Sequence, residues 1–319
     1  MLRVQSSEIS LAYEALGQGT AVLFLHGAAM QLTDWPEALV ERLAGDFSAL
    51  TVDLRDSGLS SKLGPCREVM AGHSWSALRQ QADAAPYDLF DMADDVVGAM
   101  NGLALPKAHL VGVSMGGMIA QLVAARHPKR VLSLTSLMSS AGQAGLNPAP
   151  EVRRALTDAF KVFAGPREAA QRLSLSQAAY HGPDDRYDAM AARRTLERAL
   201  SRSYCPNGVF RQLQAIFATG NRQALLGQIR CPTLVIHGTA DRCIDSSAAL
   251  SARQVIPDCE FRTIEGMGHE FTDANALILA DAVHRHCCEA EGRQSALLTE
   301  IASGTRSQKT ASSGSFQGQ

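Results

Sequence analysis

Residues 110–118 read Leu-Val-Gly-Val-Ser-Met-Gly-Gly-Met and contain a Gly-x-Ser-x-Gly pattern centred on Ser114. A short apolar run precedes the pattern, and residues 115–127 after it have the character of a helix. A serine on a sharp turn between a strand and a helix projects its hydroxyl out of the sheet. Strain of this kind is usually kept for function, so Ser114 is a candidate nucleophile.

The same stretch has a plainer interpretation, a glycine-rich phosphate loop with an ordinary serine. Neither Gly-x-x-x-x-Gly-Lys nor Gly-x-Gly-x-x-Gly occurs here, and these are the spacings that phosphate loops use. Gly112 and Gly116 also fit a tight elbow, because Cβ atoms at these positions would collide across the turn. The stretch therefore favours a nucleophile over a phosphate loop.

Apolar runs alternate with helix-like segments over most of the chain. Runs typical of buried strands occupy residues 21–25, 47–52, 109–113, 131–138, 233–237 and 260–264. Residues 2–4 and 9–13 are shorter β-like runs that are typical of an opening hairpin. The predicted fold class is therefore α/β, with a mostly parallel sheet flanked by helices.

The alternation stops after residue 138. Residues 145–223 contain no convincing strand and carry helix-like segments at 151–163, 167–180, 187–202 and 207–218. We therefore expect an α-helical cap over residues 145–223, inserted into a core formed by residues 1–144 and 224–290. Residues 60–85 are irregular and can add a second flap. The last helix is expected at 271 to about 288, and residues 291–319 are expected to form a flexible tail.

The composition, 46% hydrophobic and 19% charged, is that of an ordinary globular protein. A net charge of −2 provides no basic field for nucleic acid. No apolar run reaches the roughly 18 residues that a membrane span needs. The N-terminal residues also lack the apolar core of a signal peptide. These features favour a protein that acts on small molecules, and its oligomeric state stays open.

Seven cysteines are scattered along the chain, with no Cys-x-x-Cys pattern among them. They occupy positions 66, 205, 231, 243, 259, 287 and 288. We therefore expect no disulfide framework, no metal site and reduced thiols in a cytoplasmic protein. Cys66 and Cys243 are alternative candidate nucleophiles, but neither lies on an elbow.

A serine hydroxyl needs a base within hydrogen-bond reach, and that base needs an orienting acid. On this kind of sheet the chain order is serine, then acid, then histidine. His269 lies in Gly-Met-Gly-His just after the last expected strand, in a loop that can place it over the sheet edge. It is our candidate base among nine histidines.

The candidate acid is Asp241, which follows the expected strand 233–237 in the sequence Gly-Thr-Ala-Asp. Sites gather at the carboxyl ends of strands in open parallel sheets. Asp245 is the rival, and both residues could simply be turn residues. Residues 139–148 contain no Asp or Glu, which closes the alternative of an acid after the previous strand.

The tetrahedral intermediate of acyl transfer needs hydrogen-bond donors for its oxyanion. The amide of Met115, directly after the nucleophile, is one candidate. The amide of Ala28, in the loop after the first buried strand, is the other. His26 in the same loop is expected to brace it rather than to take part in catalysis.

From residue 21 to 288 the chain resembles the α/β-hydrolase fold superfamily. Four motifs occur in the family's order: His26-Gly27, the elbow at Ser114, Gly238-x-x-Asp241 and Gly268-His269. Residues 88–95 and 134–140 look like the branch of carboxylesterases and aclacinomycin methylesterase-like enzymes. The resemblance implies a capped serine hydrolase without a cofactor. A serine at 114, where a carboxylate would attack in haloalkane dehalogenases and epoxide hydrolases, argues against those chemistries.

The predicted activity is that of a carboxylesterase for short- to medium-chain esters, working through an acyl-enzyme. The same three residues would also serve a lactonase, a C–C bond hydrolase, a perhydrolase or an amidase, because a fold and its triad do not set the substrate. A non-catalytic small-molecule receptor on the same fold is the alternative of another class. Trp35 and Phe217 are the predicted substrate-binding residues.

Overall fold

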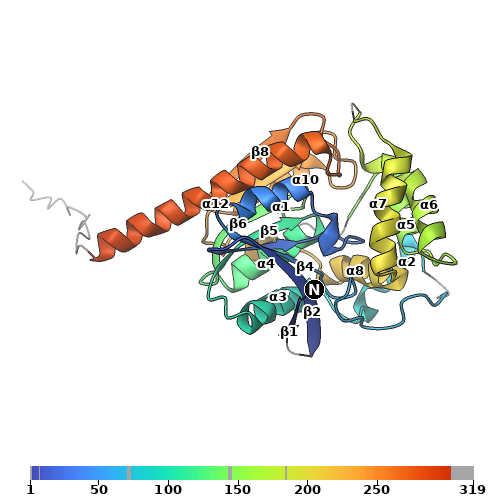
Figure 1. Ribbon diagram of the computed structural model, residues 1–319, viewed down its shortest axis with the longest axis horizontal. Coiled ribbons are helices and arrows are strands. Elements are labelled where there is room, and N and C mark those ends of the chain that lie inside the picture. The colour runs from blue at the N-terminus through green and yellow to red at the C-terminus, as the bar shows by residue number, and fades with distance from the viewer. Residues whose placement is uncertain (1, 7, 70–72, 143–145, 184, 303–319) are drawn as a thin grey trace, which may run out of the picture.

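The computed structural model describes residues 2–6, 8–69, 73–142, 146–183 and 185–302. Within these residues one sheet of eight strands runs through the molecule in the order β1-β2-β4-β3-β5-β6-β7-β8 (Figure 1). The strands are β1 (Leu2–Ser6), β2 (Ile9–Leu16), β3 (Ala21–Leu25), β4 (Ser48–Val52), β5 (Ala108–Val113), β6 (Val131–Leu137), β7 (Thr233–Gly238) and β8 (Cys259–Ile264).

The sheet is parallel except at one edge, where β2 pairs antiparallel with both β1 and β4. All the other neighbours, from β4 through β8, are parallel. The predicted α/β class and the mostly parallel sheet are therefore confirmed. Because parallel strands end at the same edge, the loops after β3, β5, β7 and β8 meet there.

Two hydrophobic cores cover the two faces of the sheet, as β3 shows most clearly. Leu23 and Leu25 belong to one core, while Val22 and Phe24 belong to the other. This alternation follows from the two-residue period of a strand. Both faces are apolar, so the strand reads as an unbroken apolar run.

Helices cover both faces. On one face α3 (Leu89–Gly102) packs against α4 (Met115–Arg126), and on the other α1 (Glu37–Ala44) packs against α12 (Asp273–Ala302). The short helices outside the stretch between β6 and β7 are η1 (Leu32–Asp34), α2 (Trp75–Gln80), η2 (Ala82–Ala84), α10 (Ser246–Leu250) and α11 (Ala252–Val255).

The stretch between β6 and β7 is helical where the structure describes it, as the sequence predicts. Its elements are α5 (Pro150–Ala159), α6 (Pro166–Ser176), η3 (Gln177–Tyr180), α7 (Ala189–Arg202), α8 (Pro206–Thr219) and α9 (Gln223–Leu226). Figure 1 shows α5, α6 and α7 gathered at one end of the molecule, beyond the sheet.

The C-terminal helix differs from the expectation. It continues from Asp273 to Ala302 and projects from the body on the side opposite α5–α7 (Figure 1). The predicted end near Cys288 is therefore wrong, and residues 291–302 are helical rather than part of a tail. Residues 303–319 lie outside the described part of the chain.

The cysteine expectation also needs correction. Cys66, in the irregular segment before α2, forms a disulfide with Cys205 at the start of α8, and their Cα atoms lie 4.2 Å apart. Asn207 adds a backbone hydrogen bond of 3.1 Å to the carbonyl of Cys66. The cysteines therefore provide no argument for a reducing compartment. No helix in the described residues is both long and apolar enough to cross a membrane.

Candidate active site

Ser114 occupies the sharp turn between β5 and α4 with φ 53° and ψ −118°. A residue with a side chain rarely adopts a positive φ, so the predicted backbone strain is present. Gly116 makes the turn possible, because a Cβ atom there would overlap the backbone carbonyls of Leu25 and His26. The Ser114 amide donates to the carbonyl of Leu137 in β6 at 2.9 Å, which fixes the elbow to the sheet.

The structure brings Ser114, His269 and Asp241 into one chain of contacts. His269 Nε2 lies 3.1 Å from Ser114 Oγ, and His269 Nδ1 lies 2.7 Å from Asp241 Oδ2. An ionised carboxylate only accepts, so Nδ1 carries the proton and Nε2 is free to accept the serine proton. This is the geometry of a nucleophile, a base and an orienting acid.

The carboxylate of Asp241 is held at both of its oxygens. Oδ1 accepts hydrogen bonds from the amides of Cys243 (2.8 Å) and Ile244 (2.9 Å). Oδ2 lies 3.2 Å from Nε2 of the fully buried His237, in addition to its contact with His269. Burial would raise the pKa of Asp241, but His269 and His237 outweigh it and hold this pKa well below its usual range.

Burial and the charged partner also act on the pKa of His269, but each acts in the direction opposite to its effect on Asp241. Burial disfavours its charged form, but the charge and hydrogen bond of Asp241 outweigh burial and hold the pKa of His269 well above its usual range. The loop that carries it is anchored from outside the sheet, because the His269 amide donates to the carbonyl of Tyr180 at 2.7 Å. The base therefore has a fixed position and a fixed tautomer.

Asp245, the rival acid, lies elsewhere. It is exposed and caps α10, where Oδ1 accepts from the amide of Ser247 at 2.8 Å. The contact with His269 belongs to Asp241. Asp245 is thus the turn residue that the alternative interpretation described.

The loop after β3 passes directly beside the serine. A Cβ atom added to Gly27 would lie 3.2 Å from Ser114 Cβ. His26 braces this loop, since its Nδ1 donates to the carbonyl of Gly27 (2.7 Å) while its Nε2 accepts from the amide of Leu54 (3.0 Å). Ala28 is the next residue of the loop, and Met115 directly follows the serine.

The two predicted substrate-binding residues have other surroundings. Trp35 is buried in the core, with its ring 5.1 Å from that of Phe24 and 5.5 Å from that of Phe271. Phe217 packs against α2, where its ring contacts Trp75 edge-on at 5.9 Å. Both therefore make packing contacts, and their role in substrate binding stays a prediction.

Several polar residues near the site were not predicted from the sequence. Asp53, fully buried after β4, accepts from the amide of Leu32 (2.8 Å) and from Arg202 of α7 (2.7 Å). Asp56 similarly pairs with Arg211 of α8. In the sequence, the acidic loop 53–56 at the end of a strand could have indicated a polar site. Its cationic partners lie about 150 residues away along the chain, so the ion pairs could not be predicted.

The described residues contain no group of three or more His, Cys, Asp or Glu side chains arranged to hold a metal ion. Ser114, His269 and Asp241 are in contact with one another. The chemistry that this arrangement can perform is nucleophilic attack by a serine, with proton transfer through a histidine.

Comparison with known proteins identifies the family to which the fold belongs. A family model described as alpha/beta hydrolase fold matches residues 20–275. The chain is similar to rhodomycin D methylesterase of Streptomyces peucetius, with 25% identity over 305 residues that cover 89% of this chain and 96% of that protein. It is also similar to the pimeloyl-[acyl-carrier protein] methyl ester esterase of Chromobacterium violaceum, with 28% identity over 260 residues that cover 78% and 87%.

A solved structure supports the fold alone. The meta-cleavage product hydrolase from Pseudomonas fluorescens IP01 superimposes with a TM-score of 0.70 at 17% sequence identity. The match covers 91% of this chain and 98% of that protein. The similarity thus extends over nearly the whole length of both chains.

Proposed function

The chain belongs to the α/β-hydrolase fold family, and we propose that it is a serine carboxylesterase that cleaves short- to medium-chain esters without a cofactor. The observation that carries the proposal is the continuous set of contacts from Ser114 Oγ through His269 to Asp241. Methyl ester hydrolases among the similar proteins support an ester as the substrate. The same contacts weigh against a non-catalytic receptor, which has no use for an oriented base.

In the proposed reaction Ser114 Oγ attacks the ester carbonyl carbon while His269 Nε2 takes the hydroxyl proton. The amides of Ala28 and Met115 donate to the oxyanion of the tetrahedral intermediate. The alcohol leaves with the proton from His269, and Ser114 remains acylated. A water molecule then attacks with His269 as the base, and the acid is released. Asp241 fixes the imidazole and stabilises its charge in both steps.

We also propose that residues 145–223 act as a cap on a core of residues 1–144 and 224–290. The contacts of this stretch converge on the loops around the site. Tyr180 accepts from the His269 amide, and Gln31 Nε2 donates to the carbonyl of Ala199 in α7 at 2.7 Å. Gln212 Nε2 of α8 donates to the carbonyl of Arg55 at 2.9 Å. A cap in this position would exclude water and strengthen the electrostatics of the site.

The proposal is tested with a fluorophosphonate probe and p-nitrophenyl butyrate. We expect the probe to label one residue, and we expect Ser114→Ala to lose both labelling and turnover. Ser76→Ala, which alters an exposed serine of α2, is the matched control and should behave like the wild type. Labelling that persists in Ser114→Ala would contradict the assignment of the nucleophile.

A further inference from the structure

Gln212 of α8 is a buried polar side chain of the proposed cap that contacts two loops of the core. It is 1% exposed. Its Oε1 accepts from the amide of Ala29, in the loop after β3, at 3.3 Å. Its Nε2 donates to the carbonyl of Arg55, in the loop after β4, at 2.9 Å. A single side chain therefore joins the proposed cap to both loops.

The amide of Gln212 has one orientation that satisfies both contacts. A backbone N–H only donates and a backbone carbonyl only accepts, so Oε1 faces Ala29 and Nε2 faces Arg55. Rotating the amide by half a turn would place donor against donor and acceptor against acceptor. Because an unpaired polar group is costly when buried, each contact holds the other in place. Gln212 thus fixes the Ala29 amide relative to the loop after β4.

The loop that donates to Gln212 is a tight turn. The Met30 amide donates to the carbonyl of Gly27 at 3.3 Å, which closes a four-residue turn around Ala28 and Ala29. Ala29 has φ 65°, in the left-handed region that residues with a side chain rarely adopt. Glycine or asparagine is the usual residue where the third position of a turn has a positive φ. The local sequence therefore disfavours this turn, and a contact from outside it, such as that of Gln212, offsets the cost.

The same turn contains the amide proposed to bind the oxyanion. The amides of Ala28 and Ala29 belong to consecutive peptide units, which are separated by the φ and ψ of Ala28 alone. The turn also lies beside the nucleophile, since a Cβ atom added to Gly27 would lie 3.2 Å from Ser114 Cβ. An oxyanion donor is effective only when it is already aimed at the place where the charge develops. The hydrogen bond to Gln212 therefore acts on the direction of this donor.

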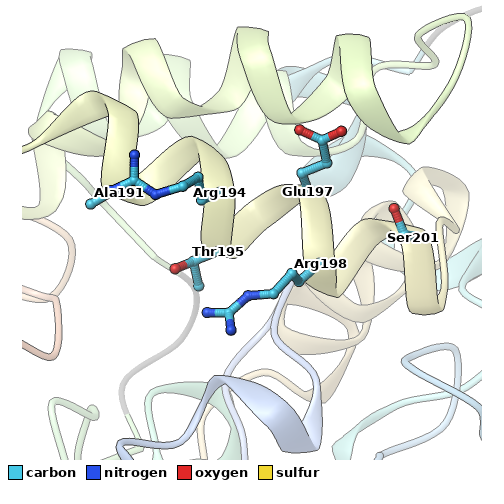
Figure 2. A pocket seen from close by; sticks show the side chains of 6 residues that line it. All are labelled: Ala191, Arg194, Thr195, Glu197, Arg198 and Ser201. Atoms are coloured by element: carbon cyan, nitrogen blue, oxygen red, sulfur yellow. The ribbon is translucent and has the colours of Figure 1, made fainter.

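Helix α7 contacts the same loop through its C-terminal end. Gln31 Nε2 donates to the carbonyl of Ala199 at 2.7 Å, and Arg202 donates to Gln31 Oε1 at 2.8 Å. Figure 2 shows the side chains that line a hollow of about 900 Å³ on α7, and all of them belong to that helix. The loop after β3 contributes no residue to this hollow within the described part of the chain. The contacts of Gln31 and Gln212 with the proposed cap are therefore separate from it.

From these contacts we infer that Gln212 is a positioning residue, through which the cap holds the Ala28 amide in place for the oxyanion. The inference rests on the proposed esterase function and gives the cap a part in the chemical steps. An oxyanion forms in both acylation and deacylation, so loss of the hydrogen bond to Gln212 would slow both. Binding of the ester, whose carbonyl is still uncharged, would change little.

The experiment compares Gln212→Leu with Gln214→Leu in the hydrolysis of p-nitrophenyl butyrate. Gln214 is a buried glutamine of the same helix, and its Nε2 donates to the carbonyl of Gln81 instead of contacting the loop after β3. We expect Gln212→Leu to lower kcat and kcat/KM together by about tenfold, less than the about 10²–10³-fold that removal of an oxyanion donor costs. KM should stay within about twofold of the wild type. Gln214→Leu should keep the wild-type values.

A trifluoromethyl ketone provides a second readout, because it forms an oxyanion adduct with Ser114 and gives no product. Its inhibition constant should rise in Gln212→Leu by the same factor as kcat/KM falls. Equal effects of the two substitutions, or a higher KM with unchanged kcat in Gln212→Leu, would overturn the inference. A thermal melt of each variant checks folding, and Gln212→Met, of similar length and without the amide, replaces Gln212→Leu if that variant does not fold.

Failure of the esterase proposal would be seen separately, as no Ser114-dependent turnover of butyrate by the wild type. In that case, hydrogen exchange at the Ala29 amide still tests the contact. We expect this amide to exchange faster in Gln212→Leu than in the wild type and to be unchanged in Gln214→Leu. Equal exchange in Gln212→Leu and the wild type would overturn the inference, because the turn would then not depend on Gln212.

Discussion

At the scale of single residues, the charge state of His269 sets the pH range of the proposed reaction. The base must be neutral to accept the serine proton, while burial and Asp241 act on its pKa in opposite directions, and Asp241 prevails. Turnover should therefore rise with pH until His269 loses its proton. The acid limb of kcat/KM against pH reports this pKa in the free enzyme.

Asp241→Asn removes the negative charge that raises the pKa of His269. We therefore expect the acid limb to move to lower pH, and kcat at the optimum to fall by about 10⁴-fold, as when the acid of a serine-protease triad is replaced by Asn. The measurement is a pH–rate profile on an activated ester. Asp245→Asn, which alters only the cap of α10, is the control and should keep the wild-type profile. If the two variants lost activity equally, Asp241 would not be the orienting acid.

Ser114, Asp241 and His269 could be located from the sequence because each follows the end of a strand in a glycine-containing turn. His237 could not be assigned a role in this way. It lies inside β7, where a continuous, mainly apolar run indicates only burial, and its contact with Asp241 depends on how the loop after β7 folds back. Both neighbours of its Nε2, Asp241 Oδ2 and the carbonyl of Ile244, are acceptors, so this nitrogen carries a proton.

At the scale of elements, the sequence pattern predicted those strands whose position depends mainly on local hydrophobicity. The run 21–25 coincides with β3, since five consecutive apolar residues fit a strand buried on both faces. The predicted end of α12 is wrong because a change in composition after Cys288 does not by itself end a helix. Residues 289–302 are mainly helix formers, and one glycine costs a helix only about 1 kcal/mol.

The disulfide between Cys66 and Cys205 links residues that are 139 positions apart, and disulfide connectivity cannot be deduced from a sequence. In space it joins the irregular segment before α2 to the N-cap residue of α8. Arg211 of the same helix donates to the carbonyl of Pro65 at 3.1 Å, so a second contact holds the same two elements. The segment is thus attached to the proposed cap as well as to the core.

Thiol titration tests this bridge. The unfolded, unreduced protein should expose five thiols and the reduced protein seven. Cys66→Ser should lower the free energy of unfolding by about 2–4 kcal/mol, because a long cross-link restricts the unfolded chain. The melting temperature should therefore fall by several degrees, whereas Cys288→Ser, at an exposed position, should leave it unchanged. Seven reactive thiols before reduction would show that the bridge does not form.

At the scale of the whole molecule, the proposed cap would control which substrates reach Ser114 through the contacts between residues 145–223 and the rest of the chain. These contacts include buried ion pairs, Arg202 with Asp53 and Arg211 with Asp56, which join α7 and α8 to the loop after β4. No periodic pattern encodes such pairs, so their existence could not be predicted from the sequence. They attach the proposed cap at several points, which favours an enclosed site over an open surface.

An enclosed site should limit the length of the acyl chain. We expect kcat/KM on p-nitrophenyl esters to be highest between butyrate and octanoate and to fall at palmitate, because an enclosed pocket suits small ligands better than the edge of a lipid droplet. Arg211→Gln, which leaves Asp56 without its ion-pair partner, should loosen the attachment of α8 and flatten this profile towards longer chains. Arg172→Gln, at an exposed position of α6, is the control and should keep the wild-type profile. High activity on emulsified long-chain triglyceride with little on butyrate would contradict an enclosing cap, since such substrates need a broad apolar opening beside the serine.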